Sequence, residues 1–197
     1  MKRYLFLIAA LALFASCAQP APQADDRFVS DGVIYELNTR QFTPEGTFDA
    51  AREQLPRLKK LGVDVVWLMP IYPIGELERK GSLGSYYAIK NYCDVNPEFG
   101  TLEDFDEFLA EAHELGLKVI LDWVANHTSP DHPWVTEQDP SWYYRDSLGH
   151  TIVEYDWTDI AKLNYDNPGV NEAMYNSMKF WVKIGRASCR ERVYACV

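Results

Sequence analysis

The sequence predicts an α/β fold built around a parallel β-sheet. Two segments, Leu61–Leu68 and Leu115–Asp122, each have a glycine typical of a helix end, followed by an apolar run rich in β-branched residues. Such runs are typical of strands that are buried on both faces of a parallel sheet. Because helical patterns separate the strands, we expect right-handed β-α-β crossovers, in either a doubly wound sheet or a closed eightfold barrel.

Strand and helix patterns alternate from residue 32 onward. A first strand is predicted over Gly32–Leu37. A short helix follows, in which Leu55, Leu58 and Leu61 are expected to share one buried face and Pro56 lies near the start. The second strand, within residues 61–68, completes the first β-α-β unit.

The helix before the third strand has the clearest signals in the chain. Thr101 and Asp104 have the spacing of a capping box, and Gly116 is expected to end the helix. Between them, apolar residues recur at helical spacing and form one stripe: Leu102, Phe105, Leu109, Ala112 and Leu115.

A last helix is predicted after a long loop. Asn167 is a suitable N-cap, Pro168 suits the first turn, and the helical pattern continues to about Lys183. None of the predicted strands is followed by a glycine-rich phosphate-binding motif, which disfavours a nucleotide-binding protein.

Composition and charge exclude several classes of protein. Of the 197 residues, 47% are hydrophobic and 14% aromatic, which is enough apolar material for a packed core and excludes a disordered chain. The formal net charge of -10 argues against a nucleic-acid partner, because phosphate groups are bound by clusters of Lys and Arg. Neutral ligands are compatible with this charge.

The N-terminus has the pattern of an export signal. Lys2 and Arg3 precede an apolar run, Tyr4–Ala15, which is too short to span a bilayer but suits a signal peptide over residues 1–16. The segment Phe14–Cys17 resembles a bacterial lipobox, so we expect lipidation of Cys17 and a tether over residues 17–30. The protein would then be an exported lipoprotein of the bacterial cell envelope, anchored to the membrane; an ordinary cleaved signal peptide is the alternative.

The C-terminal segment differs from the rest of the chain. Residues 184–197 have no helical or strand period and contain three Arg and two Cys. The segment resembles the translation of a sequencing-library adaptor, so we expect a non-native tail, with a divergent native tail as the alternative. Cys93 is then the one cysteine between Cys17 and the tail, so we expect neither a disulfide framework nor a Cys-x-x-Cys metal site.

A polar cluster ends the third predicted strand. Asp122, Asn126 and His127 would be costly to bury without partners, so we expect them to line a polar cavity at the carboxyl end of the sheet. A capping network at the entrance of the following loop is the alternative.

Other segments place this cluster in a wider pattern. They occur in a fixed order along the chain: Val33–Phe42, Leu68–Ile71, Gly84–Tyr92, Val95–Thr101 and Leu163–Pro168. Together with the polar cluster they resemble the α-amylase family, glycoside hydrolase family 13, over Asp31–Lys183.

The resemblance implies a fold and an activity. The fold is a (β/α)8 TIM barrel, of which residues 31–183 would form about the first three units, with a B domain at about 127–164 inserted after the third strand. The activity is that of an α-amylase-type glycosidase, the retaining cleavage of α-glucosidic bonds in starch-like glucans or maltooligosaccharides by two carboxylates and a third acid. None of these three carboxylates matches a position of this chain, so we expect an inactive N-terminal fragment.

The resemblance also implies roles for individual residues. Asp122 would organise the polar network, His127 would hydrogen-bond the sugar, and Tyr87 would stack against it, with a core aromatic as the alternative for Tyr87. Asn126 matches a calcium ligand of many members. Lys162 stands where many members carry an aspartate, and its ammonium would oppose a dication, so calcium is disfavoured as a cofactor.

Several functions stay open at this point. A transglycosylase on the same scaffold is the nearest alternative to a hydrolase. A non-catalytic glycan-binding or transporter-associated lipoprotein is the second, and the presence or absence of the three carboxylates would distinguish it. An unrelated barrel enzyme with a phosphate-bearing substrate is disfavoured, because the acidic chain would repel such a ligand.

Overall fold

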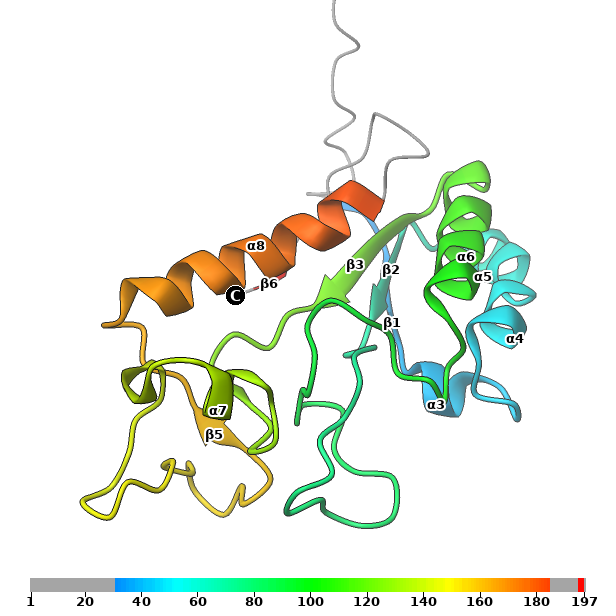
Figure 1. Ribbon diagram of the computed structural model, residues 1–197. Coiled ribbons are helices and arrows are strands. Elements are labelled where there is room, and N and C mark those ends of the chain that lie inside the picture. The colour runs from blue at the N-terminus through cyan, green and yellow to red at the C-terminus, as the bar shows by residue number, and fades with distance from the viewer. Residues whose placement is uncertain (1–30, 185–194, 197) are drawn as a thin grey trace, which may run out of the picture. The chain divides into compact units, whose positions relative to one another are not determined.

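The computed structural model describes residues 31–184 and 195–196 (Figure 1). The predicted signal peptide, Cys17, the tether and most of the C-terminal tail therefore lie outside the described residues. The chain from Gly32 onward forms one unit. Within its described part, no helix is both long and apolar enough to cross a membrane.

Three parallel strands form the centre of the fold, as the sequence predicts. They are β1 (Ile34–Leu37), β2 (Val65–Leu68) and β3 (Lys118–Asp122), paired in the order β1-β2-β3. Leu68 lies opposite Leu37 on one side and Leu121 on the other, so the carboxyl ends of the strands are level. Loops that follow the strands therefore begin side by side at one edge of the sheet.

A short fourth strand continues the sheet beyond β3. It is β6 (Ala195–Cys196), which pairs in parallel with Leu121 and Asp122. These two residues belong to the segment that the sequence predicts to be non-native, and that prediction stays open.

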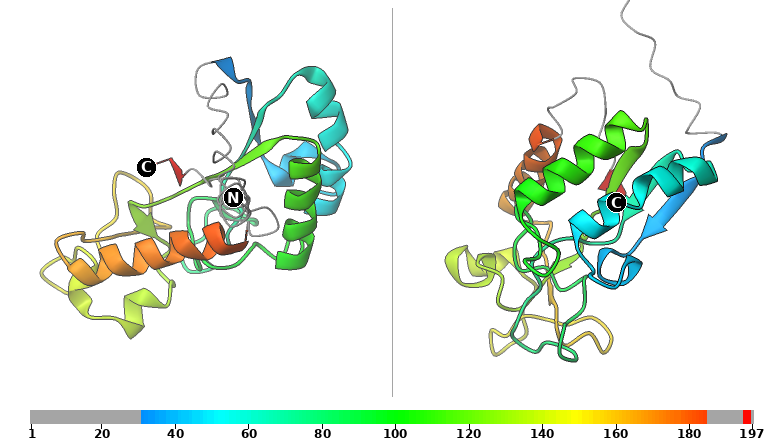
Figure 2. Two further views of the ribbon diagram at one scale, coloured as in Figure 1. Left: turned by 90° about the horizontal axis from the view of Figure 1, so that it is seen from above. Right: turned by 90° about the vertical axis from the view of Figure 1, so that its right-hand side faces the viewer.

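The helices lie alongside the strands. They are α3 (Thr39–Phe42), α4 (Phe48–Arg52), α5 (Leu55–Leu61), α6 (Leu102–Glu114) and α8 (Pro168–Ile184). In the right-hand view of Figure 2, α6 lies between the α4–α5 pair and α8. A ring contact also joins α6 to α8, since Phe105 and Trp181 have centroids 5.5 Å apart.

The short predicted helix before β2 differs from the structure in one residue. Leu55 and Leu58 of α5 are fully buried, but Leu61 is 67% exposed, so its prediction as part of the buried face is wrong. Each step of three residues falls about 60° short of a full helical turn, so Leu61 points about 120° away from Leu55. Gly62 then ends the helix in the left-handed conformation, with φ of 94°.

The core under α4 and α6 is aromatic. The Phe48 ring is fully buried and contacts three others, Phe99, Phe105 and Phe108, with centroids 5.9, 5.5 and 6.3 Å away. Phe99 ends the long loop after β2, so this cluster holds the end of that loop against the helices.

The residues after β3 form a small antiparallel pair. It consists of β4 (His127–Thr128) and β5 (Ala161–Lys162), and His127 lies opposite Lys162. Between them come α7 (Trp134–Glu137) and a 3-10 turn (Pro140–Trp142), which are too short to leave a sequence pattern. This segment projects from the carboxyl end of the sheet (Figure 1).

Candidate active site

Two of the predicted site residues meet at the carboxyl end of the sheet. Asp122 is the last residue of β3, and Tyr87 belongs to the long loop after β2. The Tyr87 hydroxyl donates a hydrogen bond to Asp122 Oδ2 at 3.1 Å. Because its side chain is 38% exposed, Tyr87 is not a core aromatic and its ring is accessible to a ligand.

His127 joins the same group from the first position of β4. Its side chain is buried, its Nε2 lies 3.2 Å from the carbonyl oxygen of Tyr87, and its Nδ1 lies 3.2 Å from the amide nitrogen of Asn126. A hydrogen on Nε2 satisfies both contacts, because Asn126 then donates to Nδ1 and Nε2 donates to Tyr87. The structure thus brings together all four residues that the sequence places in the site.

Burial sets the protonation of this group. It raises the pKa of Tyr87 to about 12, with the nearby Asp122 charge adding to the effect, so the phenol stays protonated at neutral pH. Burial also raises the pKa of Asp122, which the hydrogen bond from Tyr87 opposes. Burial lowers the pKa of His127, which makes the neutral imidazole the dominant form at neutral pH. The site therefore offers mostly uncharged hydrogen-bonding groups and one carboxylate.

Two cavities adjoin Tyr87. One, of about 670 Å³, lies between the end of β3 and α8, and its lining includes Asp122, Asn126 and Tyr165. The other, of about 360 Å³, lies beside the segment between β4 and β5, and its lining includes His127 and Trp157. Both cavities are large enough for sugar-sized ligands.

Trp157 is a site residue that sequence reasoning missed. Its side chain is 40% exposed, and its ring centroid lies 6.0 Å from that of His127. Lys80, from the loop after β2, donates to the Asp156 carbonyl at 2.7 Å and so holds this part of the segment between β4 and β5 beside the cavity. A tryptophan in an otherwise polar stretch was the available signal.

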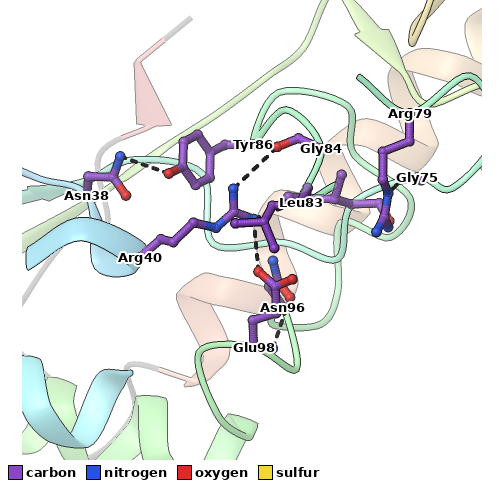
Figure 3. Close-up of polar contacts among 10 residues, drawn as sticks. Asn38, Arg40, Gly75, Arg79, Leu83, Gly84, Tyr86, Asn96 and Glu98 are labelled. Carbon is purple, nitrogen blue, oxygen red and sulfur yellow. Dashed lines mark hydrogen bonds and ion pairs between the residues drawn. The ribbon is translucent and has the colours of Figure 1, made fainter. Parts of the chain in front are cut away.

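Arg40 holds the loop that carries Tyr87 (Figure 3). Its guanidinium donates to Glu98 at 2.9 Å and to the Gly84 carbonyl at 3.3 Å, and it lies 4.4 Å from the centre of the Tyr86 ring. Asn38 donates to the Tyr86 hydroxyl at 3.1 Å. Residues that directly follow β1 therefore fix the backbone next to Tyr87, a role that the sequence motif did not reveal.

The residues near Asn126 do not fit a calcium site. Lys162 forms an ion pair with Glu154, and Asn126 donates to the other oxygen of the same carboxylate at 2.7 Å. One carboxylate is thus shared between an ammonium and an amide NH2, whereas calcium takes six to eight oxygen ligands. Nowhere in residues 31–184 do three or more Asp, Glu, His or Cys side chains gather in a group that could hold a metal.

The sequence of this chain is similar to those of known proteins. The family model described as "Alpha amylase, catalytic domain" matches residues 24–141. "Probable oligo-1,6-glucosidase 2" of Bacillus subtilis is 29% identical over 79% of this chain and 33% of its own length. "Alpha-1,4-glucan:maltose-1-phosphate maltosyltransferase" of Mycolicibacterium smegmatis is 37% identical over 71% of this chain and 23% of its own length.

The fold is also similar to that of a solved structure. The crystal structure of an alpha-amylase from Lactobacillus plantarum aligns with a TM-score of 0.75 and 44% identity, over 78% of this chain and 36% of that one. The chain thus spans between 23% and 36% of the length of these three proteins.

Proposed function

The chain belongs to the α-amylase family, and we propose that it is the N-terminal part of a retaining glycoside hydrolase that acts on starch-like glucans or maltooligosaccharides. The described strands and helices are part of a (β/α)8 TIM barrel, with the B domain inserted after the third strand. In such barrels the site lies at the carboxyl ends of the strands, where Asp122 and the loop of Tyr87 are found.

The observation that carries the proposal is the arrangement of Tyr87, Asp122 and His127 beside the two cavities. An accessible aromatic ring packs against the apolar C–H face of a sugar, and the Asp122 carboxylate accepts hydrogen bonds from hydroxyl groups. Both ring nitrogens of His127 are already paired, so a sugar hydroxyl would share Nε2 with the Tyr87 carbonyl or Nδ1 with the Asn126 amide. A neutral sugar also suits the acidic balance of the chain.

The reaction needs groups beyond these three residues. Retaining cleavage uses two carboxylates about 5 Å apart, one as nucleophile and one as general acid and base. Asp122 is not proposed for either role: by the family resemblance it organises the polar network, and its carboxylate accepts the hydrogen bond from the Tyr87 hydroxyl. We propose that the uninterrupted gene, in which native sequence would stand in place of the adaptor-like segment 184–197, encodes the nucleophile, the general acid and the third acid. We propose also that the present polypeptide is inactive.

The proposal is tested by assaying the product of the uninterrupted gene beside this chain on maltooligosaccharides. We expect the gene product to release reducing sugar and this chain to release none, since without the nucleophile there is no covalent path. In the active product, Tyr87→Ala should lower kcat/KM by about 10- to 100-fold, and Tyr87→Phe, which keeps the ring, should cost less. Nucleophile-dependent turnover by this chain, or a gene product without activity on any α-glucan, would contradict the proposal.

A transglycosylase is the second candidate. The similarity to a protein named as a maltosyltransferase favours it, since that name describes the transfer of a maltosyl group. The same assay separates the two, because a transglycosylase forms oligosaccharides longer than its substrate and a hydrolase releases shorter ones. A glycan-binding protein without activity would instead bind maltooligosaccharides, and its gene would lack the carboxylates.

Lipid attachment completes the proposed function. We propose export of the protein and its anchoring in the bacterial envelope through Cys17, which the lipobox-like segment before it supports. Such an anchor would keep the enzyme where external glucans are found.

A further inference from the structure

A polar network joins the B domain to the end of β3. Lys162 lies in β5, directly opposite His127 of β4. Its ammonium forms an ion pair with Oε1 of Glu154, and Oε2 of the same carboxylate accepts a hydrogen bond from Asn126 at 2.7 Å. The Asn126 amide nitrogen also lies 3.2 Å from Nδ1 of His127. Glu154 and Asn126 thus link Lys162 to the imidazole of the site.

The charge and burial of this network favour a fixed arrangement. The side chains of Lys162 and Glu154 are 33% and 24% exposed, so both are partly withdrawn from water. The Tyr144 ring lies 5.7 Å from the Lys162 ammonium and adds a cation–π contact. Removal of the ammonium would leave the Glu154 carboxylate without its counter-charge in this partly buried place.

We propose that the Lys162 ammonium takes the place of a divalent cation here. Its ion pair with Glu154 holds the Asn126 amide, and Asn126 in turn holds His127 in the orientation seen in the site. Lys162 and Glu154 are therefore positioning residues, and the B domain is joined to β3 without calcium. The use of His127 for a sugar rests on the proposed function, whereas the ion pair and its effect on His127 do not.

The first test measures the thermal unfolding of the full chain in excess calcium chloride and in excess EDTA. We expect the same Tm in both solutions. Lys162→Met should lower Tm by about 3 °C or more, and Lys162→Arg should restore most of the loss. Lys162→Asp places a second carboxylate near Glu154 and Asn126, so its Tm should be low in EDTA and rise with calcium. Lys60→Met, at an exposed position of α5, is the matched control and should leave Tm unchanged.

The second test follows the His127 ring by nitrogen NMR. Lys162→Met and Glu154→Gln should each shift the Nδ1 and Nε2 signals of His127, and the double variant should shift them no further, because both changes release the same amide. The Lys60→Met control should leave these signals in place. This readout needs no substrate and no cooperative unfolding transition.

Several results would overturn the inference. They are stoichiometric calcium binding by the unaltered chain in calorimetry, a Tm of that chain that rises with calcium, and unchanged His127 signals in Lys162→Met. Failure of the glycosidase assay would overturn the proposed function and would leave these measurements unaffected.

Discussion

Tyr87 connects the two polar residues of the site through two different atoms. Its hydroxyl donates to Asp122, and its backbone carbonyl lies 3.2 Å from His127 Nε2. Because the ring and the backbone are held separately, Tyr87 keeps its position in the lining of both cavities. This arrangement explains how an exposed tyrosine is held by its neighbours without being part of the core.

His132 is a buried histidine that makes stability depend on pH. Its ring is 4% exposed, and its Nδ1 accepts a hydrogen bond from the Trp134 backbone N–H at 3.1 Å. Burial lowers its pKa to about 4, with a small opposing effect from the Asp131 charge. The folded chain therefore favours the neutral ring, and protonation also removes the acceptor that Trp134 uses.

We expect the free energy of unfolding to fall as pH falls between the unfolded pKa of His132 and about 4. The folded pKa is depressed, so the full contribution is present above about pH 6.5 and is lost toward about pH 4. Urea unfolding at about pH 7 and about pH 5 should show a loss on the order of 2 kcal/mol from this group.

The control for this prediction is His132→Asn. Its side-chain oxygen still accepts from Trp134, and it does not titrate. The variant should lose less stability over the same range of pH than the unaltered chain. Equal losses in the two proteins would show that other groups cause the pH dependence.

At the scale of elements, α6 is the part of the fold that the sequence predicts best. Its capping box is present, since Thr101 Oγ1 accepts from the Asp104 backbone N–H at 3.2 Å and Asp104 Oδ2 accepts from the Thr101 N–H at 2.7 Å. The hydrogen bonds that the Asp104 carboxylate accepts from the Thr101 N–H and hydroxyl lower the pKa of Asp104. Both partners lie within one helical turn, so the pattern is visible in the sequence.

Thr101→Ala should therefore destabilise the chain by about 1 kcal/mol, because the first turn of α6 loses an acceptor for one of its N–H groups. Denaturant unfolding measures the change. Thr101→Ser keeps the hydroxyl and should lie within a few tenths of a kcal/mol of the unaltered protein. An unaffected midpoint in Thr101→Ala would mean that packing of the α6 stripe alone holds this turn.

The region between β1 and β2 was predicted less well. The sequence indicates one short helix, and the structure has three, α3, α4 and α5, of four to seven residues each. Helices of this length are marginal by themselves and owe their stability to tertiary contacts, here those of Phe48 with the rings around it. A propensity pattern of four or five residues is too short to show them.

At the scale of the whole molecule, the proposed export and anchoring would determine where the protein works. If Cys17 carries the lipid, cells that express the gene should hold the protein in the membrane fraction, and labelled fatty acid should appear on it. Cys17→Ser should lose the label and move the protein to the soluble fraction. Cys93→Ser, within the described domain, is the control and should change neither. Label that persists in Cys17→Ser would refute the anchor.

Much of this protein is determined by local sequence. The positions of the three main strands, the ends of α6, the N-cap Asn167 of α8, and the residue types Tyr87, Asp122 and His127 follow from patterns within a few positions of each other. The family resemblance rests on the same short segments, and the family match confirms it. Hydrophobic periodicity and helix capping involve residues within one or two helical turns of each other, so both can be recognised in the sequence.

Only the tertiary structure decided which of these residues touch. Tyr87 meets Asp122 and His127 across 35 and 40 positions of sequence, and Glu154 meets Asn126 across 28. The choice of Glu154 as the partner of Lys162 and the placement of Trp157 beside His127 also depend on how the B domain folds over the end of β3. Such contacts depend on the packing of whole elements, because loop closure brings together groups that no local pattern relates.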